Sequence, residues 1–198
     1  MHGLINRAIQ SFTCNTYGQE RWLDVAEAAK LGFSDFEAML LYEDDLTARV
    51  LAALAAELGR TEAELLEDLG TYLVCNPQVE ALRRLLRFGG VSYVEFLHSL
   101  DDLPDRARLA VADLSLPPLE LIEHTASQFS LICHPGLPGF SWVMMGILRA
   151  MADDYGALVM LDHVGHGGDA DRIEITLVET AFAEGRHFEL GARAEAEG

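Results

Sequence analysis

Two short stretches of the sequence combine side chains that can bind metals or act as nucleophiles. Residues 162–169 read DHVGHGGD, which places two imidazoles and two carboxylates in a glycine-rich hairpin. Such side chains bind divalent cations, but the spacing matches no established metal motif, so a solvated acidic hairpin is the simpler interpretation. Cys133 and His134 are adjacent at the end of a strand-like run, where neighbouring side chains point to opposite faces of a sheet. They therefore cannot pair as an activated nucleophile, and the sequence predicts no enzymatic activity.

The composition argues against several classes of partner. The chain of 198 residues has 14 Lys and Arg against 32 Asp and Glu, a formal charge of -18, so a nucleic-acid backbone would be repelled. The first residues lack the pattern of a secretion signal, and no apolar run is long enough to span a membrane. The three cysteines are far apart and form no CxxC pair, which argues against disulfides and a cysteine zinc site. We therefore expect a cytoplasmic protein that binds neither nucleic acid nor membrane.

The first half of the chain shows the spacing of amphipathic helices. Apolar side chains recur every three or four residues in six segments, at residues 4–18, 22–32, 46–59, 61–72, 76–86 and 92–100. Thr61 with Glu64, and Ser92 with Glu95, are spaced as capping boxes at two helix starts. The next stretch, SLDDLPDRARL (99–109), looks like a helix that a proline interrupts.

The pattern changes after residue 118. Short strand-like runs cover residues 119–124, 129–133, 157–161 and 172–178, and helical spacing returns between the second and third runs, at residues 139–155. Several helices followed by strands with one inserted helix predict an α+β fold with a four-stranded antiparallel sheet.

Four strings of residues, in order, resemble the heme-nitric oxide/oxygen binding (H-NOX) family, a sensor domain found in bacteria and in soluble guanylate cyclase. They are MHGLINRAI with YGQERW, then LLEDLGTYLV, FLHSLDDL and GFSWVMMGIL, and the resemblance spans about residues 1–180. It implies a helical distal lobe at about residues 1–65, a proximal lobe at about 66–180 and an extension at 181–198. In that family a heme lies between the two lobes.

The two motifs that hold heme in this family are altered here. The family's iron-binding histidine follows Leu-Asp-x-Leu, but Leu100-Asp101-Asp102-Leu103 is followed by Pro104, which has no metal-binding atom. The Tyr-x-Ser-x-Arg motif that binds the heme propionates falls on Cys133, Pro135 and Leu137. The resemblance therefore implies a cofactor whose usual iron ligand and propionate clamp are both missing.

Other family positions keep their apolar character. Ile5, Leu73 and Val143 fall where the family lines the gas side of its heme, and Pro117 matches a proline that presses on the macrocycle. The same residues would also suit an ordinary packed core. Two histidines are weak candidates for a substitute metal ligand. His98 faces about 120° away from the family's ligand position on the helix, and His134 lies nearer to a heme edge than to its iron.

The resemblance implies a sensory domain that signals by a shift of one lobe against the other. Heme with altered ligation and a heme-free pocket for another apolar ligand both remain open, and the double loss of ligand and clamp favours the heme-free form. Stand-alone members of the family regulate histidine kinases or cyclic-dinucleotide enzymes such as diguanylate cyclases, so the same class of partner is implied. The alternative is a protein interaction module whose pocket has collapsed and whose acidic surface regulates a signalling enzyme.

Overall fold

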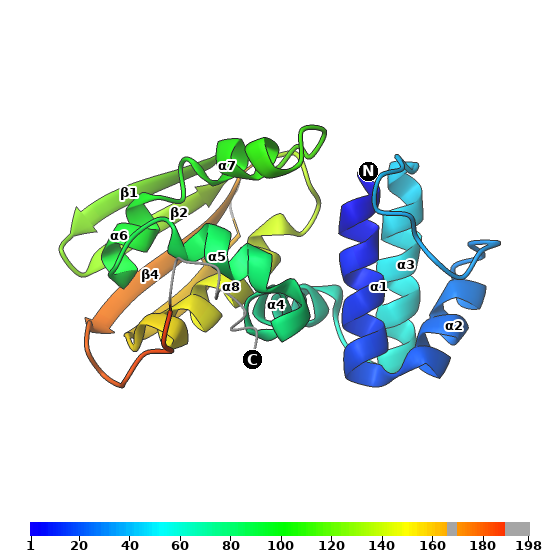
Figure 1. Ribbon diagram of the computed structural model, residues 1–198, viewed down its shortest axis with the longest axis horizontal. Coiled ribbons are helices and arrows are strands. Elements are labelled where there is room, and N and C mark those ends of the chain that lie inside the picture. Colours follow the sequence, from blue (N-terminus) through cyan, green and yellow to red (C-terminus); the bar gives the residue numbers. More distant parts are fainter. Residues whose placement is uncertain (166–169, 189–198) are drawn as a thin grey trace, which may run out of the picture.

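The computed structural model describes residues 1–165 and 170–188, in which helices precede and flank one antiparallel sheet (Figure 1). The helices are α1 Gly3–Tyr17, α2 Gln19–Ala28, α3 Asp44–Leu58, α4 Glu62–Cys75, the 3-10 turn η1 Pro77–Val79, α5 Glu80–Arg87, α6 Tyr93–His98, α7 Leu103–Ala110 and α8 Phe140–Tyr155. The strands are β1 Leu119–Thr125, β2 Gln128–Cys133, β3 Leu158–Val164 and β4 Asp171–Glu179. None of the helices among these residues is long and apolar enough to cross a membrane.

The four strands form one sheet in the order β1-β2-β4-β3, and every neighbouring pair is antiparallel. This confirms the predicted α+β fold. Strand β3 runs three residues beyond the predicted end at Leu161, because the backbone of residues 162–164 pairs with residues 172–174 of β4. The hairpin predicted to begin at Asp162 therefore begins later.

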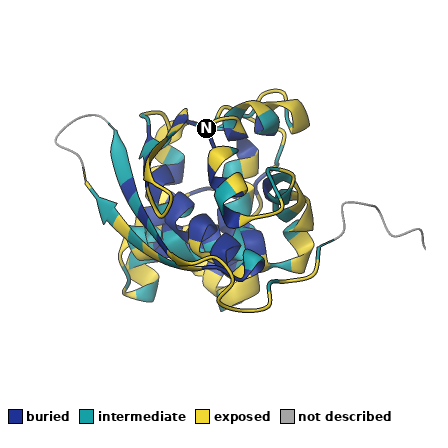
Figure 2. Ribbon diagram, turned by 90° about the vertical axis from the view of Figure 1, so that its left-hand side faces the viewer, coloured by how far each residue is buried: buried dark blue, intermediate teal, exposed yellow. Residues whose placement is uncertain are grey.

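Two hydrophobic cores lie side by side. The helical core is formed by buried residues of α1, α2, α3 and the first half of α4, among them Phe12, Trp22, Val50 and Leu65. The sheet core is formed by α5 to α8 and the inner face of the sheet, among them Phe96, Leu100, Leu131, Met144, Leu148 and Ile173. Figure 2 shows the buried positions on the faces that the helices and strands turn toward these cores.

Helix α4 joins the two cores. Its Leu65, Leu66 and Leu69 pack in the helical core, whereas its Val74 packs in the sheet core. In Figure 1 the helix lies between α1, α2 and α3 on one side and the sheet with its helices on the other. The predicted lobe boundary near residue 65 lies within α4, and the division into two lobes stays a prediction.

Local capping explains several helix starts. The Thr61 hydroxyl accepts a hydrogen bond from Glu64 N, and the Glu64 carboxylate accepts one from Thr61 N, so the predicted capping box is present. Ser92 caps α6 through Glu95 N at 3.2 Å, but the Glu95 carboxylate accepts from Val91 N instead of closing a second box.

Pro104 does not interrupt a helix. Helix α6 ends at His98, a turn follows at residues 99–102, and Pro104 then stands in the first turn of α7. The first backbone amides of a helix have no intrahelical acceptor, so proline loses nothing there and its fixed φ suits the helix. The interpretation of the stretch as one broken helix was wrong, because the proline starts a second helix.

Candidate functional site

A cleft of about 620 Å³ opens between the two cores. The helical core contributes residues of α1, α3 and α4, and the sheet core contributes the segment after α7, the segment before α8 and the first turns of α8. Most of its walls are apolar: Ile5, Ile9, Leu41, Ala48, Leu51, Leu66, Leu69, Leu116, Pro117, Pro118, Pro135, Leu137, Pro138, Phe140 and Val143. A concave site of this volume with mostly apolar walls could accommodate a small molecule.

Five of the nine residues expected to line a pocket border this cleft, namely Ile5, Pro117, Pro135, Leu137 and Val143. The other four do not. Leu73 packs against the helical core, whereas Leu100 and Cys133 are buried in the sheet core. Pro104 borders a second, smaller hollow of about 370 Å³.

Pro104 is separated from the cleft by the segment that follows α7. Ser115, Leu116 and Pro118 border both hollows, so this segment lies between them. Helix α7 is held in place by Arg106, whose guanidinium donates to Ser99 O at 2.7 Å and to Leu85 O at 3.1 Å. The position of the family's iron ligand is therefore fixed on the far side of residues 115–118.

Cys133 is unsuited to metal or nucleophilic chemistry. It is 4% exposed, and burial together with the nearby Asp171 carboxylate raises the pKa of its thiol to about 12. Metal binding and nucleophilic attack require the thiolate, which such an environment disfavours.

The two candidate histidine ligands lie outside the cleft. His98 Nε2 is 3.2 Å from a carboxylate oxygen of Glu123, and its ring meets the edge of Phe129. His134 Nε2 is 3.5 Å from a carboxylate oxygen of Glu120. Both side chains are about half exposed, and neither borders the cleft.

The candidate metal loop is only partly described. His163 stacks on Trp142 with ring centroids 3.8 Å apart, and its Nε2 is 2.9 Å from Ser141 Oγ, which donates to Asp171 at 2.7 Å. Because the serine proton is given to Asp171, the imidazole donates to the hydroxyl and cannot activate it. His166 and Asp169 lie outside the described residues. Within residues 1–165 and 170–188, no three His, Cys, Asp or Glu side chains gather in a way that could hold a metal ion.

The polar side chains of the cleft are acidic or neutral. Asp44, Glu62 and Asp113 stand at its border, and no Lys or Arg is among the described residues that line it. The amino group of Met1 is 2.6 Å from the Asp44 carboxylate and donates to Tyr42 O. His2 also lines the cleft and is 7% exposed.

These residues do not fit a heme held in the way the family resemblance implies. The positions expected to bind propionates are apolar, and the charged side chains at the border would repel carboxylates. The position expected to ligate iron is a proline outside the cleft. We therefore derive no chemistry through a heme.

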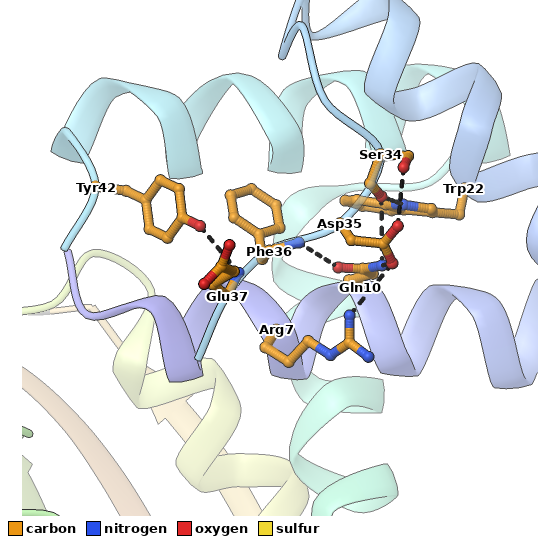
Figure 3. Close-up of polar contacts among 8 residues, drawn as sticks. All are labelled: Arg7, Gln10, Trp22, Ser34, Asp35, Phe36, Glu37 and Tyr42. Carbon is orange, nitrogen blue, oxygen red and sulfur yellow. Dashed lines mark hydrogen bonds and ion pairs between the residues drawn. The ribbon is translucent and has the colours of Figure 1, made fainter. Parts of the chain in front are cut away.

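Sequence reasoning missed a polar clamp between α1, α2 and the segment that follows α2 (Figure 3). Buried Gln10 of α1 accepts a hydrogen bond from Phe36 N at 2.9 Å and donates to Asp35 at 2.7 Å, and Trp22 Nε1 donates to Ser34 O at 2.7 Å. The Ser34 hydroxyl and the Gln10 amide both donate to the Asp35 carboxylate, and these hydrogen bonds lower the pKa of Asp35. The clamp holds residues 34–36 against α1 and α2.

The rest of this segment wraps the start of α1. Gly3 N donates to Leu40 O at 2.7 Å, and a Cβ on Gly3 would lie 2.1 Å from Glu37 O, so the segment approaches as closely as only glycine allows. Leu41 then lines the cleft. The polar residues Asn6, Gln10 and Thr13, which interrupt the apolar stripe of α1, were a signal in the sequence that could have pointed to such a clamp.

Comparison with known proteins agrees with this fold. The sequence model of the Haem-NO-binding (HNOB) family matches residues 2–163. Soluble guanylate cyclase 89Db of Drosophila melanogaster is 22% identical over 182 residues, which are 89% of this chain but 27% of that protein. The chain thus spans about a quarter of the curated relative that it matches.

Solved structures of similar fold include two H-NOX proteins at 15% identity. An Fe(II) H-NOX mutant from S. oneidensis has a TM-score of 0.78, covering 95% of this chain and 100% of that chain. The Fe(II) unliganded H-NOX protein from K. algicida has a TM-score of 0.75, covering 96% of this chain and 100% of that chain. With a family match over most of its length and the same architecture, the chain belongs to the Haem-NO-binding family and has the H-NOX fold.

Proposed function

We propose that the chain is a cytoplasmic sensory domain that binds a small apolar ligand in the cleft between its two cores. The observation that carries this proposal is the cleft itself, whose apolar walls come from both cores. A ligand that contacts both walls stabilises one relative position of the cores, because it can shift an equilibrium by its difference in affinity for the two states. Ligand binding would thus be reported as a shift of one lobe against the other.

Heme in its usual form is not part of this proposal. The proline at position 104 and the apolar residues at 133, 135 and 137 support either a heme-free cleft or a heme without a protein ligand to iron. Burial of a porphyrin against apolar walls could still give binding without an iron bond.

The partner in this proposal is a signalling enzyme, a histidine kinase or a diguanylate cyclase. The match to a soluble guanylate cyclase supports a regulatory role, since that protein is a signalling enzyme by name and contains a region similar to this chain. The measurement is the rate of a purified histidine kinase or diguanylate cyclase with and without the purified domain and its ligand.

A second candidate is an interaction module that acts through its acidic surface without a ligand. The formal charge of -18 favours this candidate, because it would attract a basic face of a partner. The open cleft favours the ligand-binding function instead, since the interaction module was expected to have a collapsed pocket.

The experiment that separates the two candidates is to block the cleft. Ala48 is an exposed residue of α3 that lines it, and Ala52 is an exposed residue one turn further along the same helix that does not. Ala48→Trp should abolish binding of an apolar ligand, and Ala52→Trp should leave it unchanged. Regulation of the partner that survives Ala48→Trp would favour the interaction module.

A further inference from the structure

Among the described residues that line the cleft, His2 is the histidine, and its hydrogen bonds indicate which class of ligand the cleft could bind. His2 is 7% exposed. Its Nδ1 accepts a hydrogen bond from Leu4 N at 3.1 Å, and this hydrogen bond caps α1. In a neutral imidazole with an accepting Nδ1, the proton is on Nε2. Among the described residues no partner is found for this Nε2.

The capping hydrogen bond also decides which chemistry His2 can perform. A metal ligand at Nε2 would need its lone pair there and the proton on Nδ1, facing the Leu4 amide proton. That arrangement would replace the helix cap with two opposed donors. His2 is therefore suited to donate a hydrogen bond into the cleft and unsuited to bind iron.

Two carboxylates at the border of the cleft would repel a negatively charged ligand. Glu62 and Asp113 line the cleft, and neither makes an ion pair within the part of the chain that the structure describes. Two unpaired carboxylates next to apolar walls disfavour an anionic ligand, and discrimination by repulsion is a common device in specific sites.

We propose that the cleft selects an uncharged apolar molecule that carries a hydrogen-bond-accepting oxygen, such as a ketone, ester or alcohol, and excludes carboxylates. The oxygen accepts from His2 Nε2, while the chain of the ligand lies against Ile5, Leu69 and Val143. In the cleft this donor is accessible to water, and the ligand oxygen would replace that water as the acceptor, which contributes about the net free energy of one hydrogen bond and fixes the orientation of the ligand. The inference rests on the proposed function, because it assigns a ligand class to the same cleft.

The test uses four probes with matched ten-carbon chains: 2-decanone, 1-decanol, decanoate and decylamine. Dissociation constants are measured by isothermal titration calorimetry on the full chain. We expect 2-decanone and 1-decanol to bind, and decanoate to bind at least tenfold more weakly than 2-decanone.

The double variant Glu62→Gln with Asp113→Asn tests the repulsion. It should strengthen decanoate binding by about fivefold, which is the scale of two partly screened charges. The matched control, Glu20→Gln with Asp24→Asn on the exposed side of α2, should leave it unchanged.

The role of His2 is tested by His2→Asn. Asparagine keeps an oxygen that can cap α1 but lacks a donor at the position of Nε2. Affinity for 2-decanone should fall by about fivefold, the size of one neutral hydrogen bond, while the melting temperature stays close to that of the unaltered chain. His2→Phe is the second variant, which fills the ring space without a donor and should show the same loss.

The outcomes distinguish a wrong ligand class from a wrong proposed function. Equal affinity for decanoate and 2-decanone, or tightest binding of decylamine, would overturn this inference and leave the apolar cleft in place. Unchanged 2-decanone affinity in both His2 variants would overturn the role of His2. Binding that survives Ala48→Trp, or no binding by any probe, would overturn the proposed function itself.

Discussion

Gly70 of α4 and Gly146 of α8 lie against the backbone of the opposite helix where the two helices cross. A Cβ on Gly70 would lie 2.1 Å from Val143 O, and a Cβ on Gly146 would lie 1.9 Å from Glu67 O. No side chain fits at such distances, so the two glycines allow a crossing that other residues would force apart. Since α4 contributes to both cores and Val143 lines the cleft, this crossing joins the two cores beside the cleft.

Gly146→Ala should therefore destabilise the fold. The added methyl group would displace α4 or α8, at a cost of about 1–3 kcal/mol in the free energy of unfolding. The measurement is urea unfolding followed by circular dichroism. Gly165→Ala is the control, because a Cβ there meets no atom within 4 Å. Equal stabilities of the two variants would contradict the close crossing.

The buried carboxylate of Asp154 joins α8 to α5, and its backbone oxygen binds the segment that follows β4. Asp154 is 0% exposed, Arg83 donates to it at 2.8 Å, and Arg186 N donates to its backbone oxygen at 2.9 Å. Asp154→Ala leaves Arg83, and Arg87 whose Nε is 3.6 Å from the carboxylate, without their partner near an apolar interior and should cost about 3–5 kcal/mol. Asp153→Ala, on the exposed neighbour, should change the free energy of unfolding little. Similar losses in both variants would show that the buried pairing contributes nothing particular.

The raised pKa of Cys133 makes stability depend on alkaline pH. The thiol keeps its proton in the folded protein up to a pKa of about 12, whereas the unfolded chain releases it above the ordinary value of 9.0. The folded state thus binds more protons between pH 9 and 12. Stability present below pH 9 is lost as the pH rises through this window, by about 1.4 kcal/mol per pH unit at most.

The difference between the unaltered chain and Cys133→Ala isolates this effect, because all other groups titrate in both. Unfolding free energies measured at pH 8, 9, 10 and 11 should converge as the pH rises. A constant difference between the two proteins would mean that the thiol ionises as freely in the folded state as in the unfolded chain.

The clamp around Gln10 gives a prediction about local stability. Gln10→Leu leaves the buried Phe36 amide without an acceptor, which should cost about 1–3 kcal/mol. Hydrogen exchange at Phe36 should accelerate accordingly. Arg7→Ala removes only an exposed contact to Asp35 at 3.4 Å and should leave this exchange rate nearly unchanged. Rapid exchange of Phe36 in the unaltered protein would contradict the clamp.

Pro104→His should not restore heme ligation. The new imidazole would stand at the second hollow, on the far side of residues 115–118 from the cleft. Absorption spectra with reduced hemin should therefore be the same for Pro104→His and for the control Pro104→Ala. A Soret band of five-coordinate heme that appears only in the histidine variant would show that residue 104 reaches the cleft.

Local signals in the sequence predicted much of the fold. The Thr61 capping box, the glycines after helices and the alternating strands gave the elements to within a few residues, because these features act over one turn or one strand pair. The family resemblance placed Ile5, Pro117 and Val143 at one cleft. It also placed Leu73 and Cys133 in the pocket, but they pack in the helical core and in the sheet core. Neighbouring positions on a strand or helix point in different directions, so a small shift moves a side chain out of a pocket.

Contacts between distant residues could not be predicted in this way. The stacking of Trp142 on His163 and the clamp between Gln10 and Asp35 depend on how helices, strands and loops pack against one another. The spacing of these residues in the sequence does not predict either contact. Pro104 was misinterpreted for the same reason. A proline in a helical pattern can end one helix or begin the next, and only the turn at residues 99–102 decides between them.

The most direct test of the central claim is to locate the ligand by methyl NMR. In protein with labelled isoleucine and valine methyl groups, addition of 2-decanone should shift Ile5 and Val143, which line the cleft, and leave Ile173 and Val25, which are buried in the sheet core and the helical core, in place. These shifts should vanish in Ala48→Trp. Shifts confined to Ile173 or Val25, or shifts at Ile5 that persist in Ala48→Trp, would contradict a ligand site between the two cores.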